Sequence, residues 1–248
     1  MVLPVMPVKL LPPAPLPPHA ALLLDLDGTL LDLAATPDAV TVAPDLAATL
    51  RRLRERLGGA LAIISGRPVE QVDALLPAIP YAVAGEHGAA IRFAPDAAPV
   101  RAPLPALPAA WLDAAAALVA GHPGTLLEPK SRGFAVHYRG APEAGPALHE
   151  ALAALPGLGE THHLLAAHMA VELRPVGADK GTAVTALLAR APFAGRVPIY
   201  VGDDVTDEDA IRVAQDSGGI GLRVAEAFGD AAGVRAWLAR LAGGGQGA

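Results

Sequence analysis

The sequence predicts an α/β protein in which a Rossmann-like, doubly wound parallel sheet forms the core and a smaller α+β domain is inserted into it. Three short apolar runs that end in polar residues predict buried parallel strands, at residues 20–27, 61–65 and 197–201. Stretches with apolar residues at helical spacing lie between or after these runs. This alternation of strand and helix occurs at both ends of the chain and is typical of a doubly wound core.

The first unit of the core is predicted to be a strand, a helix and a second strand. Between the first two strands, residues 44–57 place leucines at positions 46, 50, 53 and 57, which is the spacing of one helix face. Gly58 and Gly59 follow and predict the end of this helix. Further helices are predicted at three later segments of the core, 68–76, 179–190 and 207–214.

The middle of the chain predicts a different arrangement. A proline-rich linker leads into a predicted helix at 109–120, which is followed by strand-like residues at 125–139. A second helix near 142–155 and a strand pair that ends at Pro175 complete this part of the chain. The order of helix, strands, helix and strands predicts a separate α+β fold.

The predicted domain organisation follows from this change of pattern. The first 19 residues carry seven prolines and no uninterrupted apolar stretch of the kind found in secretory signals. Chain bends at 102–105 and 175–177 would let the inserted domain close over a ligand. We expect a proline-rich leader at 1–19, a core made of 20–101 and 176–242, an inserted α+β cap domain at 102–175 and a flexible tail at 243–248.

The composition excludes several classes of protein. Hydrophobic residues make up 52% of the 248 residues and charged residues 18%, which excludes disorder over most of the chain. The net charge of -6 excludes a broad basic surface for nucleic acid or an anionic membrane. No apolar run reaches the roughly 18 residues that a membrane span needs, and the absence of cysteine excludes disulfides and thiolate zinc sites. We therefore expect a soluble, monomeric, cytoplasmic protein that acts on a small molecule.

The first candidate site is the sequence DLDGT, in which Asp25 and Asp27 leave the first predicted strand through Gly28. Two carboxylates at the carboxyl edge of a parallel sheet can converge on one ligand. Taken alone, two such carboxylates more often lie in a solvent-exposed loop without a ligand. A calcium-binding EF-hand loop is a poor match, because it has its glycine at position 6 whereas Gly28 is at position 4.

Three further polar segments follow predicted strands or open a helix, and they raise the specificity of this site. They are SGR at 65–67, DKG at 179–181 and GDDVTD at 202–207. A doubly wound sheet would present all four segments at one edge. Their ordered combination resembles the four signature motifs of the haloacid dehalogenase superfamily of phosphatases, and the resemblance covers the whole core.

The resemblance implies a metal-assisted phosphatase with a covalent intermediate. Asp25 would attack a phosphate monoester to form an aspartyl-phosphate, and Asp27 would serve as general acid and then base. At about 4 Å two like charges repel by about 4 kcal/mol at an effective dielectric near 20, so Mg²⁺ and Lys180 would offset the repulsion between nucleophile and phosphate. The implied metal set is Asp25, the main-chain carbonyl of Asp27 and Asp203, supported by Asp204 and Asp207, and the implied phosphate-binding set is Thr29, Ser65, Gly66 and Arg67.

The inserted segment carries polar residues that suit a polyhydroxylated ligand, since carboxylates accept from sugar hydroxyls and lysine donates to them. They form the sequences EPK at 128–130, HYR at 137–139 and ELRP at 172–175, while GEHG at 85–88 belongs to the core. Together these residues resemble the trehalose-6-phosphate phosphatases. The resemblance implies sugar contacts by Glu128, Lys130 and Glu172, with His87, Arg132, His137 and Arg139 as neighbours.

Alternatives remain open at this point. A phosphatase of another sugar phosphate such as sucrose 6-phosphate, or a sugar phosphomutase, would share the core motifs, and a non-catalytic sugar-phosphate sensor would need neither Asp25 nor Asp27. Surface salt bridges explain Arg139 and Arg174 equally well. Several other residues are expected to be structural: His162, His163 and His168 outside any metal site, Asp38, Asp45 and Asp113 as helix caps, and Trp111 and Trp237 as core or interface anchors.

Overall fold

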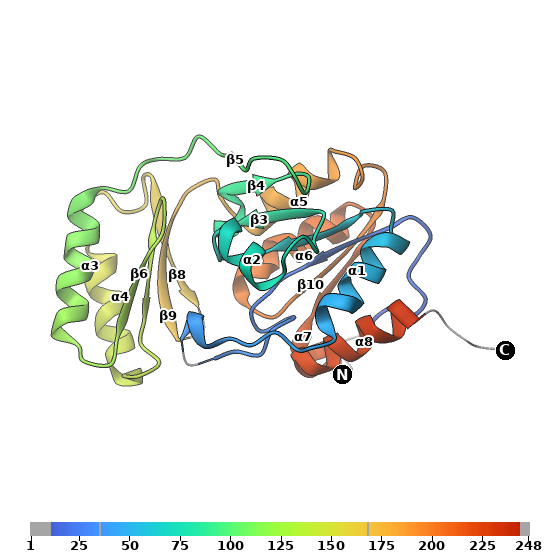
Figure 1. Cartoon of the computed structure of the whole chain (residues 1–248). Coiled ribbons are helices and arrows are strands. Elements are labelled where there is room, and N and C mark those ends of the chain that lie inside the picture. Colours follow the sequence, from blue (N-terminus) through green and yellow to red (C-terminus); the bar gives the residue numbers. More distant parts are fainter. Residues whose placement is uncertain (1–10, 35, 168, 244–248) are drawn as a thin grey trace, which may run out of the picture.

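The structure, a computed structural model, describes residues 11–34, 36–167 and 169–243, and it contains two separate sheets (Figure 1). The larger sheet has the strand order β11-β10-β1-β2-β3-β4-β5. Its strands are β1 (Ala20–Leu24), β2 (Leu61–Ile64), β3 (Ala82–Gly85), β4 (Ala90–Arg92), β5 (Val100–Arg101), β10 (Val197–Gly202) and β11 (Ile220–Arg223).

The five strands from β11 to β3 pair in parallel, and β4 and β5 add an antiparallel edge. Strand β1 lies at the centre, where Leu22 pairs with Ile199 of β10 on one side and with Leu61 of β2 on the other. All five residues of β1 are buried, which explains why the strand consists of apolar residues only. The predicted doubly wound fold class is confirmed.

Helices cover both faces of this sheet. Helices α1 and α8 pack against each other on one face, and α5 and α6 pack against each other on the other (Figure 1). Leu46, Leu50 and Leu53 of α1 are buried, and Gly58 and Gly59 adopt positive φ just after it. The core helices are α1 (Leu46–Arg56), α2 (Val69–Leu75), α5 (Lys180–Leu188), α6 (Glu208–Asp216), α7 (Val224–Ala227) and α8 (Ala231–Gly243), with 3-10 turns η1 (Pro37–Ala39), η2 (Glu86–Gly88) and η4 (Val205–Asp207).

The second sheet lies beside the core, and we call residues 109–175, which contain it, the cap. Its antiparallel strands have the order β6-β7-β9-β8. Helices α3 and α4 cover the face that points away from the core (Figure 1), where Trp111, Phe134 and Leu148 form a separate apolar cluster. The cap elements are α3 (Ala109–Gly121), β6 (Leu126–Pro129), β7 (Phe134–His137), η3 (Pro142–Ala144), α4 (Gly145–Ala153), β8 (His162–Ala167) and β9 (Ala170–Pro175).

The proline-rich segment at the start of the chain is described in part. Residues 1–10 lie outside the described part, but residues 11–19 are packed against the core rather than free: Trp237 Nε1 donates to the Pro13 carbonyl at 3.0 Å, and Leu16 contacts the main apolar cluster. Of the predicted tail, residues 244–248 lie outside the described part, and helix α8 runs to Gly243. Within the described residues no helix is long and apolar enough to cross a membrane.

The residues expected to be structural have mixed outcomes. Trp237 is buried in the main core and Trp111 in the cap cluster, as predicted. Asp45 stands at the N-cap of α1, but its side chain makes no capping hydrogen bond, so that part of the prediction is wrong. His162 donates through Nε2 to the Arg132 carbonyl at 3.0 Å, while His168 lies outside the described residues.

Candidate active site

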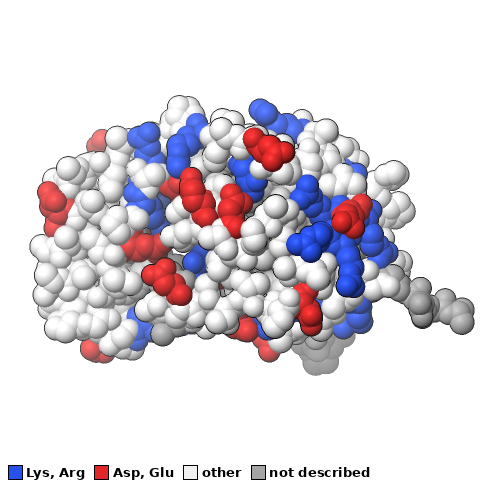
Figure 2. Space-filling model, in the orientation of Figure 1, with Lys and Arg blue, Asp and Glu red and all other residues white. Residues whose placement is uncertain are grey.

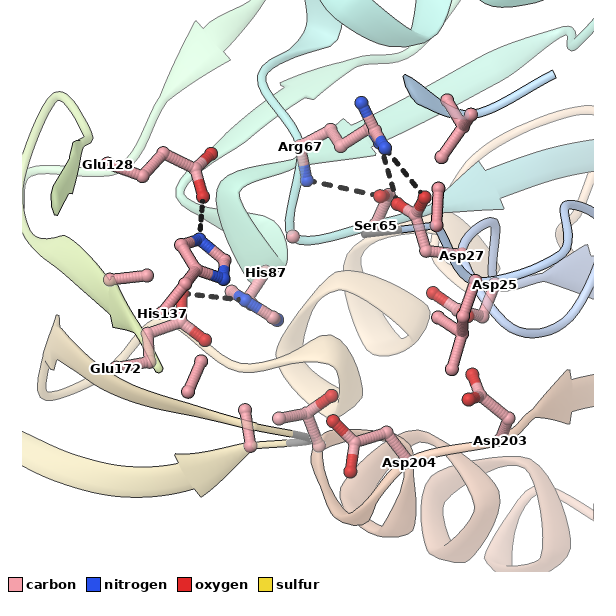
Figure 3. Close-up of a pocket in the computed structure, with 18 of the residues that line it drawn as sticks. Asp25, Asp27, Ser65, Arg67, His87, Glu128, His137, Glu172, Asp203 and Asp204 are labelled. Atoms are coloured by element: carbon pink, nitrogen blue, oxygen red, sulfur yellow. Dashed lines mark hydrogen bonds and ion pairs between the residues drawn. The ribbon is translucent and has the colours of Figure 1, made fainter. Parts of the chain in front are cut away.

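A cavity of about 200 Å³ lies between the carboxyl ends of the core strands and the face of the cap sheet that is not covered by helices. Acidic and basic side chains both lie around the hollow in this region of the surface (Figure 2). Asp25, Asp27 and Asp203 lie on the core side, and Glu128, His137 and Glu172 lie across from them on the cap side (Figure 3). The site is therefore built from both parts of the chain.

Lys180 ties two motifs of the core together. Its Nζ atom lies 2.7 Å from Asp25 Oδ1 and 2.7 Å from Asp207 Oδ1, and its side chain is 3% exposed. The position of Lys180 at the start of α5 is fixed by Asp179, whose side chain accepts from the Thr182 amide in a capping box. Burial alone would lower the pKa of Lys180, but Asp207 and Asp25 raise it above its ordinary value. The ammonium group therefore stays charged beside Asp25.

Asp207 is fully buried and uses both of its oxygen atoms. Oδ1 accepts from Lys180 and, at 2.5 Å, from the hydroxyl of Tyr200, while Oδ2 accepts from the amides of Asp203 and Asp204 at 3.2 and 3.0 Å. A carboxylate offers about four lone pairs, so these four donors saturate it. Asp207 thus orients Lys180 and the loop that carries Asp203.

Ligand atoms of Asp25, Asp203 and Asp207 lie within 4.8 Å of one another, close enough to hold a metal ion. Burial and the charges of Asp207 and Asp203 raise the pKa of Asp25 well above its ordinary value, although Lys180 opposes the shift. A divalent cation between Asp25 and Asp203 would relieve this crowding, and oxygen donors are the ligands that Mg²⁺ prefers. The donor set therefore fits Mg²⁺.

Gly28 is required where the chain turns away from Asp27. Its φ is +80°, and a Cβ atom there would lie 2.0 Å from Asp203 Oδ2. Thr29 is fully buried, and its hydroxyl donates to Asp203 Oδ1 at 3.3 Å. Thr29 does not line the cavity. The structure places Thr29 against Asp203, and its contact with phosphate stays a prediction from the sequence.

Asp27 is held by the arginine of the second motif. Arg67 Nε and Nη2 each lie 2.7 Å from one oxygen of Asp27, a bidentate pair (Figure 3). Ser65 is buried, and its Oγ accepts from the Arg67 amide at 3.1 Å. These contacts bring three predicted site residues to one wall of the cavity.

On the cap side, Glu172 is the centre of a buried charged cluster. Lys130 Nζ lies 2.5 Å and His87 Nε2 2.9 Å from Glu172 Oε1. Burial alone would raise the pKa of Glu172, but His87 and Lys130 lower it well below its ordinary value. Glu172 is therefore a carboxylate. Because it can only accept, His87 carries its proton on Nε2, and His87 Nδ1 is buried without a hydrogen-bond partner among the described residues.

Glu128 lies on the same face of the cap sheet as Glu172 but two strands away, on β6. Its Oε2 atom is 2.8 Å from His137 Nε2 (Figure 3). Burial would raise the pKa of Glu128, but the His137 hydrogen bond and the charge of Lys130 lower it. Glu128 and Glu172 thus both face the cavity as acceptors.

The structure brings most of the predicted site residues together, with exceptions. Arg139 and His137 line the cavity, but Arg132 does not, because it lies in the turn after β6 and presents its carbonyl to His162. Asp204 lines the cavity, yet its Oδ1 accepts from the Val205 amide. Several lining residues were not predicted: Leu33, Ala34, Thr36 and Val40 before α1, Ala135, Ala167 and Ala170 of the cap, and Thr206.

Comparison with known proteins identifies the family of this chain. Residues 23–232 match the family model described as trehalose-phosphatase. The chain is 41% identical over 215 residues to the probable trehalose-phosphate phosphatase of Sinorhizobium fredii, covering 82% of this chain and 77% of that one. It is 35% identical over 201 residues to the trehalose-6-phosphate phosphatase of Escherichia coli, covering 81% and 75%.

Solved structures agree on the fold. The C-terminal domain of C. albicans trehalose-6-phosphate phosphatase superposes with a TM-score of 0.75 at 21% identity, covering 90% of this chain and 92% of that one. A sucrose-phosphatase from Synechocystis superposes with a TM-score of 0.51 at 19% identity, covering 84% of each chain. The overall fold is therefore similar to that of both solved structures. From the family match and the two relatives, the chain belongs to the trehalose-phosphatase family.

Proposed function

We propose that this protein hydrolyses trehalose 6-phosphate to trehalose and phosphate, a reaction of trehalose biosynthesis. The observation that carries the proposal is the pairing of two sets of groups across one cavity. The core presents Asp25 held by the buried Lys180, and the cap presents the carboxylates Glu128 and Glu172. A phosphate ester of a polyhydroxylated sugar has the matching anion and hydroxyl groups. The relatives' names supply the particular sugar.

The first half of the reaction uses Asp25 as the nucleophile. A carboxylate oxygen of Asp25 forms a bond to phosphorus, the bond from phosphorus to the sugar oxygen breaks, and protonated Asp27 gives its proton to the leaving oxygen. Lys180 lies beside Asp25 and offsets the negative charge that gathers on the phosphoryl group. The phosphate would compete with Asp27 for Arg67, so substrate binding frees Asp27 for its role as an acid.

The second half releases phosphate. Asp27 takes a proton from a water molecule, the water oxygen forms a bond to phosphorus, and the bond from phosphorus to Asp25 breaks. Asp25 returns to its starting state, and Asp27 holds the proton for the next cycle. Ser65 and the main chain at Gly66 bind the phosphoryl oxygens from the end of β2.

Mg²⁺ is part of the proposal. Asp25, Asp203 and the main-chain carbonyl of Asp27 would hold it, and Asp207 supports the ion only indirectly because its lone pairs are already used. When bound, the ion supplies positive charge that lets Asp25 approach the phosphate. The monomeric state and the cytoplasmic location stay predictions from the sequence.

Sugar recognition is assigned to the cap. Glu128 and Glu172 accept from hydroxyl groups, Lys130 donates to them, and His137 and Arg139 lie beside them on the cavity wall. His87 approaches the same sugar from the core.

The test is phosphate release from trehalose 6-phosphate, sucrose 6-phosphate, glucose 6-phosphate and p-nitrophenyl phosphate, with Mg²⁺ and with EDTA. We expect metal-dependent turnover with a strong preference for trehalose 6-phosphate, and no turnover by an Asp25→Asn variant that keeps its circular dichroism spectrum. Preference for another sugar phosphate would overturn the assignment of trehalose 6-phosphate as the substrate but would leave the proposed catalytic mechanism in place. Undiminished turnover by Asp25→Asn would overturn the chemistry.

A further inference from the structure

The cap strand that faces the centre of the cavity, β7, carries only the methyl group of Ala135 at the position between β6 and β9 where the two carboxylates lie. Across the sheet, Glu128 of β6 pairs with Ala135 of β7, and Ala135 pairs with Glu172 of β9. Side chains two residues apart on a strand point to the same face, so His137 shares this face of β7 with Ala135. Gly133 precedes β7 and lies against β9, where a Cβ atom would be 2.1 Å from the Leu173 carbonyl oxygen. On this face of the sheet, only the methyl group of Ala135 therefore stands between Glu128 and Glu172. We call the space above Ala135 the β7 gap.

The β7 gap lets a charged side chain cross the sheet. Lys130 follows β6, and its amide donates to the Gly133 carbonyl at 2.9 Å, so it starts on the far side of β7 from Glu172. Its Nζ atom nevertheless reaches Glu172 Oε1 at 2.5 Å. Neighbouring strands are about 4.8 Å apart, so β6 and β9 are separated by roughly 10 Å, and the aliphatic part of Lys130 must pass over β7. Ala135 is 4% exposed, as expected for a residue beneath such a chain.

The crossing separates the two carboxylates into different environments. Lys130 and His87 hold Glu172 on one side of the gap, while His137 holds Glu128 on the other. Carboxylate acceptors and the Lys130 ammonium donor then lie on the same cavity wall, which suits a ring that carries hydroxyl groups around its edge. His87 lines the same cavity, its side chain is 8% exposed, and its buried Nδ1 has no hydrogen-bond partner in the part of the chain that the structure describes. This nitrogen is an additional acceptor for a hydroxyl donor in the ligand.

We infer that Ala135 is a specificity-determining positioning residue: its small side chain lets Lys130 reach Glu172 and so sets the donor and acceptor pattern that selects a sugar phosphate over other phosphate esters. This inference rests on the proposed function, because the sugar is the part of the substrate that the cap would contact. A larger residue at 135 would lift Lys130 off the sheet and leave Glu172 without its nearest cation. Asp25, Asp27 and Lys180 lie in the core and would be unaffected.

The test is a size series at position 135 with kinetics on two substrates. Ala135→Gly keeps the gap open, Ala135→Ser adds one atom, and Ala135→Val fills the gap. The matched control is Ala166→Val, the same substitution in β8 of the same sheet, at an exposed position that does not line the cavity. Hydrogen bonds to charged groups contribute about 1.5–3 kcal/mol, so we expect Ala135→Val to raise KM for trehalose 6-phosphate by roughly ten- to a hundredfold.

The comparison between substrates and variants decides the outcome. We expect Ala135→Val to keep wild-type kinetics on p-nitrophenyl phosphate, Ala135→Ser to be intermediate, and Ala135→Gly and Ala166→Val to resemble wild type on both substrates. Unchanged KM in Ala135→Val, equal losses on both substrates, or a loss in Ala135→Gly as large as in Ala135→Val would each overturn the inference. If Ala135→Val does not fold, the comparison of Ala135→Ser with Ala135→Gly makes the same decision.

The proposed function can fail separately. If wild type prefers a sugar phosphate other than trehalose 6-phosphate, the trehalose assignment is wrong, and the series is run on the preferred sugar phosphate with the same expected order. If wild type shows no preference for any sugar phosphate over p-nitrophenyl phosphate, there is no sugar selection for Ala135 to set, and the inference is overturned together with the substrate assignment.

Discussion

His87 of the core and Glu172 of the cap are joined by a hydrogen bond of 2.9 Å between Nε2 and Oε1. The imidazole also lies against the phosphate-binding loop, because a Cβ atom on Gly66 would be 2.6 Å from His87 Nε2. One ring therefore touches both the loop that would bind the phosphate and the carboxylate that would bind the sugar.

Stability should depend on pH through His87. Burial lowers the pKa of His87 below its ordinary value of 6.5, although Glu172 opposes the shift. His87 therefore resists protonation in the folded state more than in the unfolded state. The contribution of the neutral imidazole to the free energy of unfolding is present above about pH 6.5 and is lost as the pH falls below that value. We expect urea denaturation at about pH 7.5 and about pH 5.5 to show a smaller decrease for His87→Gln than for wild type. An equal decrease in the free energy of unfolding of both proteins would contradict the role of His87 in this pH dependence.

Removing the hydroxyl of Tyr200 should slow catalysis without weakening substrate binding. The hydroxyl donates to Asp207 at 2.5 Å, and Asp207 orients Lys180. Tyr200→Phe should lower kcat on trehalose 6-phosphate and on p-nitrophenyl phosphate by the same factor, about tenfold, with KM for the sugar phosphate unchanged. Tyr81→Phe, a change outside the cavity lining, is the control. A rise in KM with unchanged kcat would remove Tyr200 from this role.

Gly28→Ala should inactivate the enzyme through Asp203. The added Cβ would lie 2.0 Å from Asp203 Oδ2 at a residue with φ of +80°. We expect loss of turnover on every substrate and a higher Mg²⁺ requirement, with Mg²⁺ binding measured by calorimetry. Gly58→Ala is the matched control, since Gly58 also has positive φ but its Cβ would meet only the end of the Arg196 side chain at 3.3 Å. Inactivation of both variants would indicate general backbone strain instead.

Loss of a cap carboxylate should affect the sugar phosphate selectively. Glu128→Ala and Glu172→Ala remove acceptors on the cap side of the cavity and leave the core motifs in place. We expect kcat/KM for trehalose 6-phosphate to fall by roughly ten- to a hundredfold, with p-nitrophenyl phosphate hydrolysis near wild type. Glu150→Ala, at an exposed position of α4, should change neither. Equal losses on both substrates would exclude these residues from sugar recognition.

The sequence predicted the strands that carry the motifs because each is a buried apolar run with a polar end. It did not predict β3, β4 and β5, which have four, three and two residues and offer too little pattern. The wall formed before α1 by residues such as Leu33 and Val40 was missed for a similar reason, since apolar loop residues carry no motif.

Individual side-chain roles depended on contacts far apart in the sequence. Tyr200 sits in an apolar strand and looks like an ordinary core residue, and its hydroxyl gains significance only from its contact with Asp207. Thr29 belongs to a recognisable motif, yet folding buries it against Asp203. Arg132 is next to cavity residues in the chain, but the turn after β6 directs only its neighbour Lys130 to the cavity.

The insertion of the cap between β5 and α5 separates two kinds of mutational freedom. Groups that carry the phosphoryl chemistry come from the core, whereas Glu128, Lys130, Ala135 and Glu172 come from a single continuous insertion. A library randomised only on the helix-free face of the cap sheet would explore new ester selectivity while every member kept the same hydrolytic machinery. Most of the sugar-facing groups thus lie in a part of the chain that has its own apolar cluster, and His87 is the group that the core contributes to the same wall.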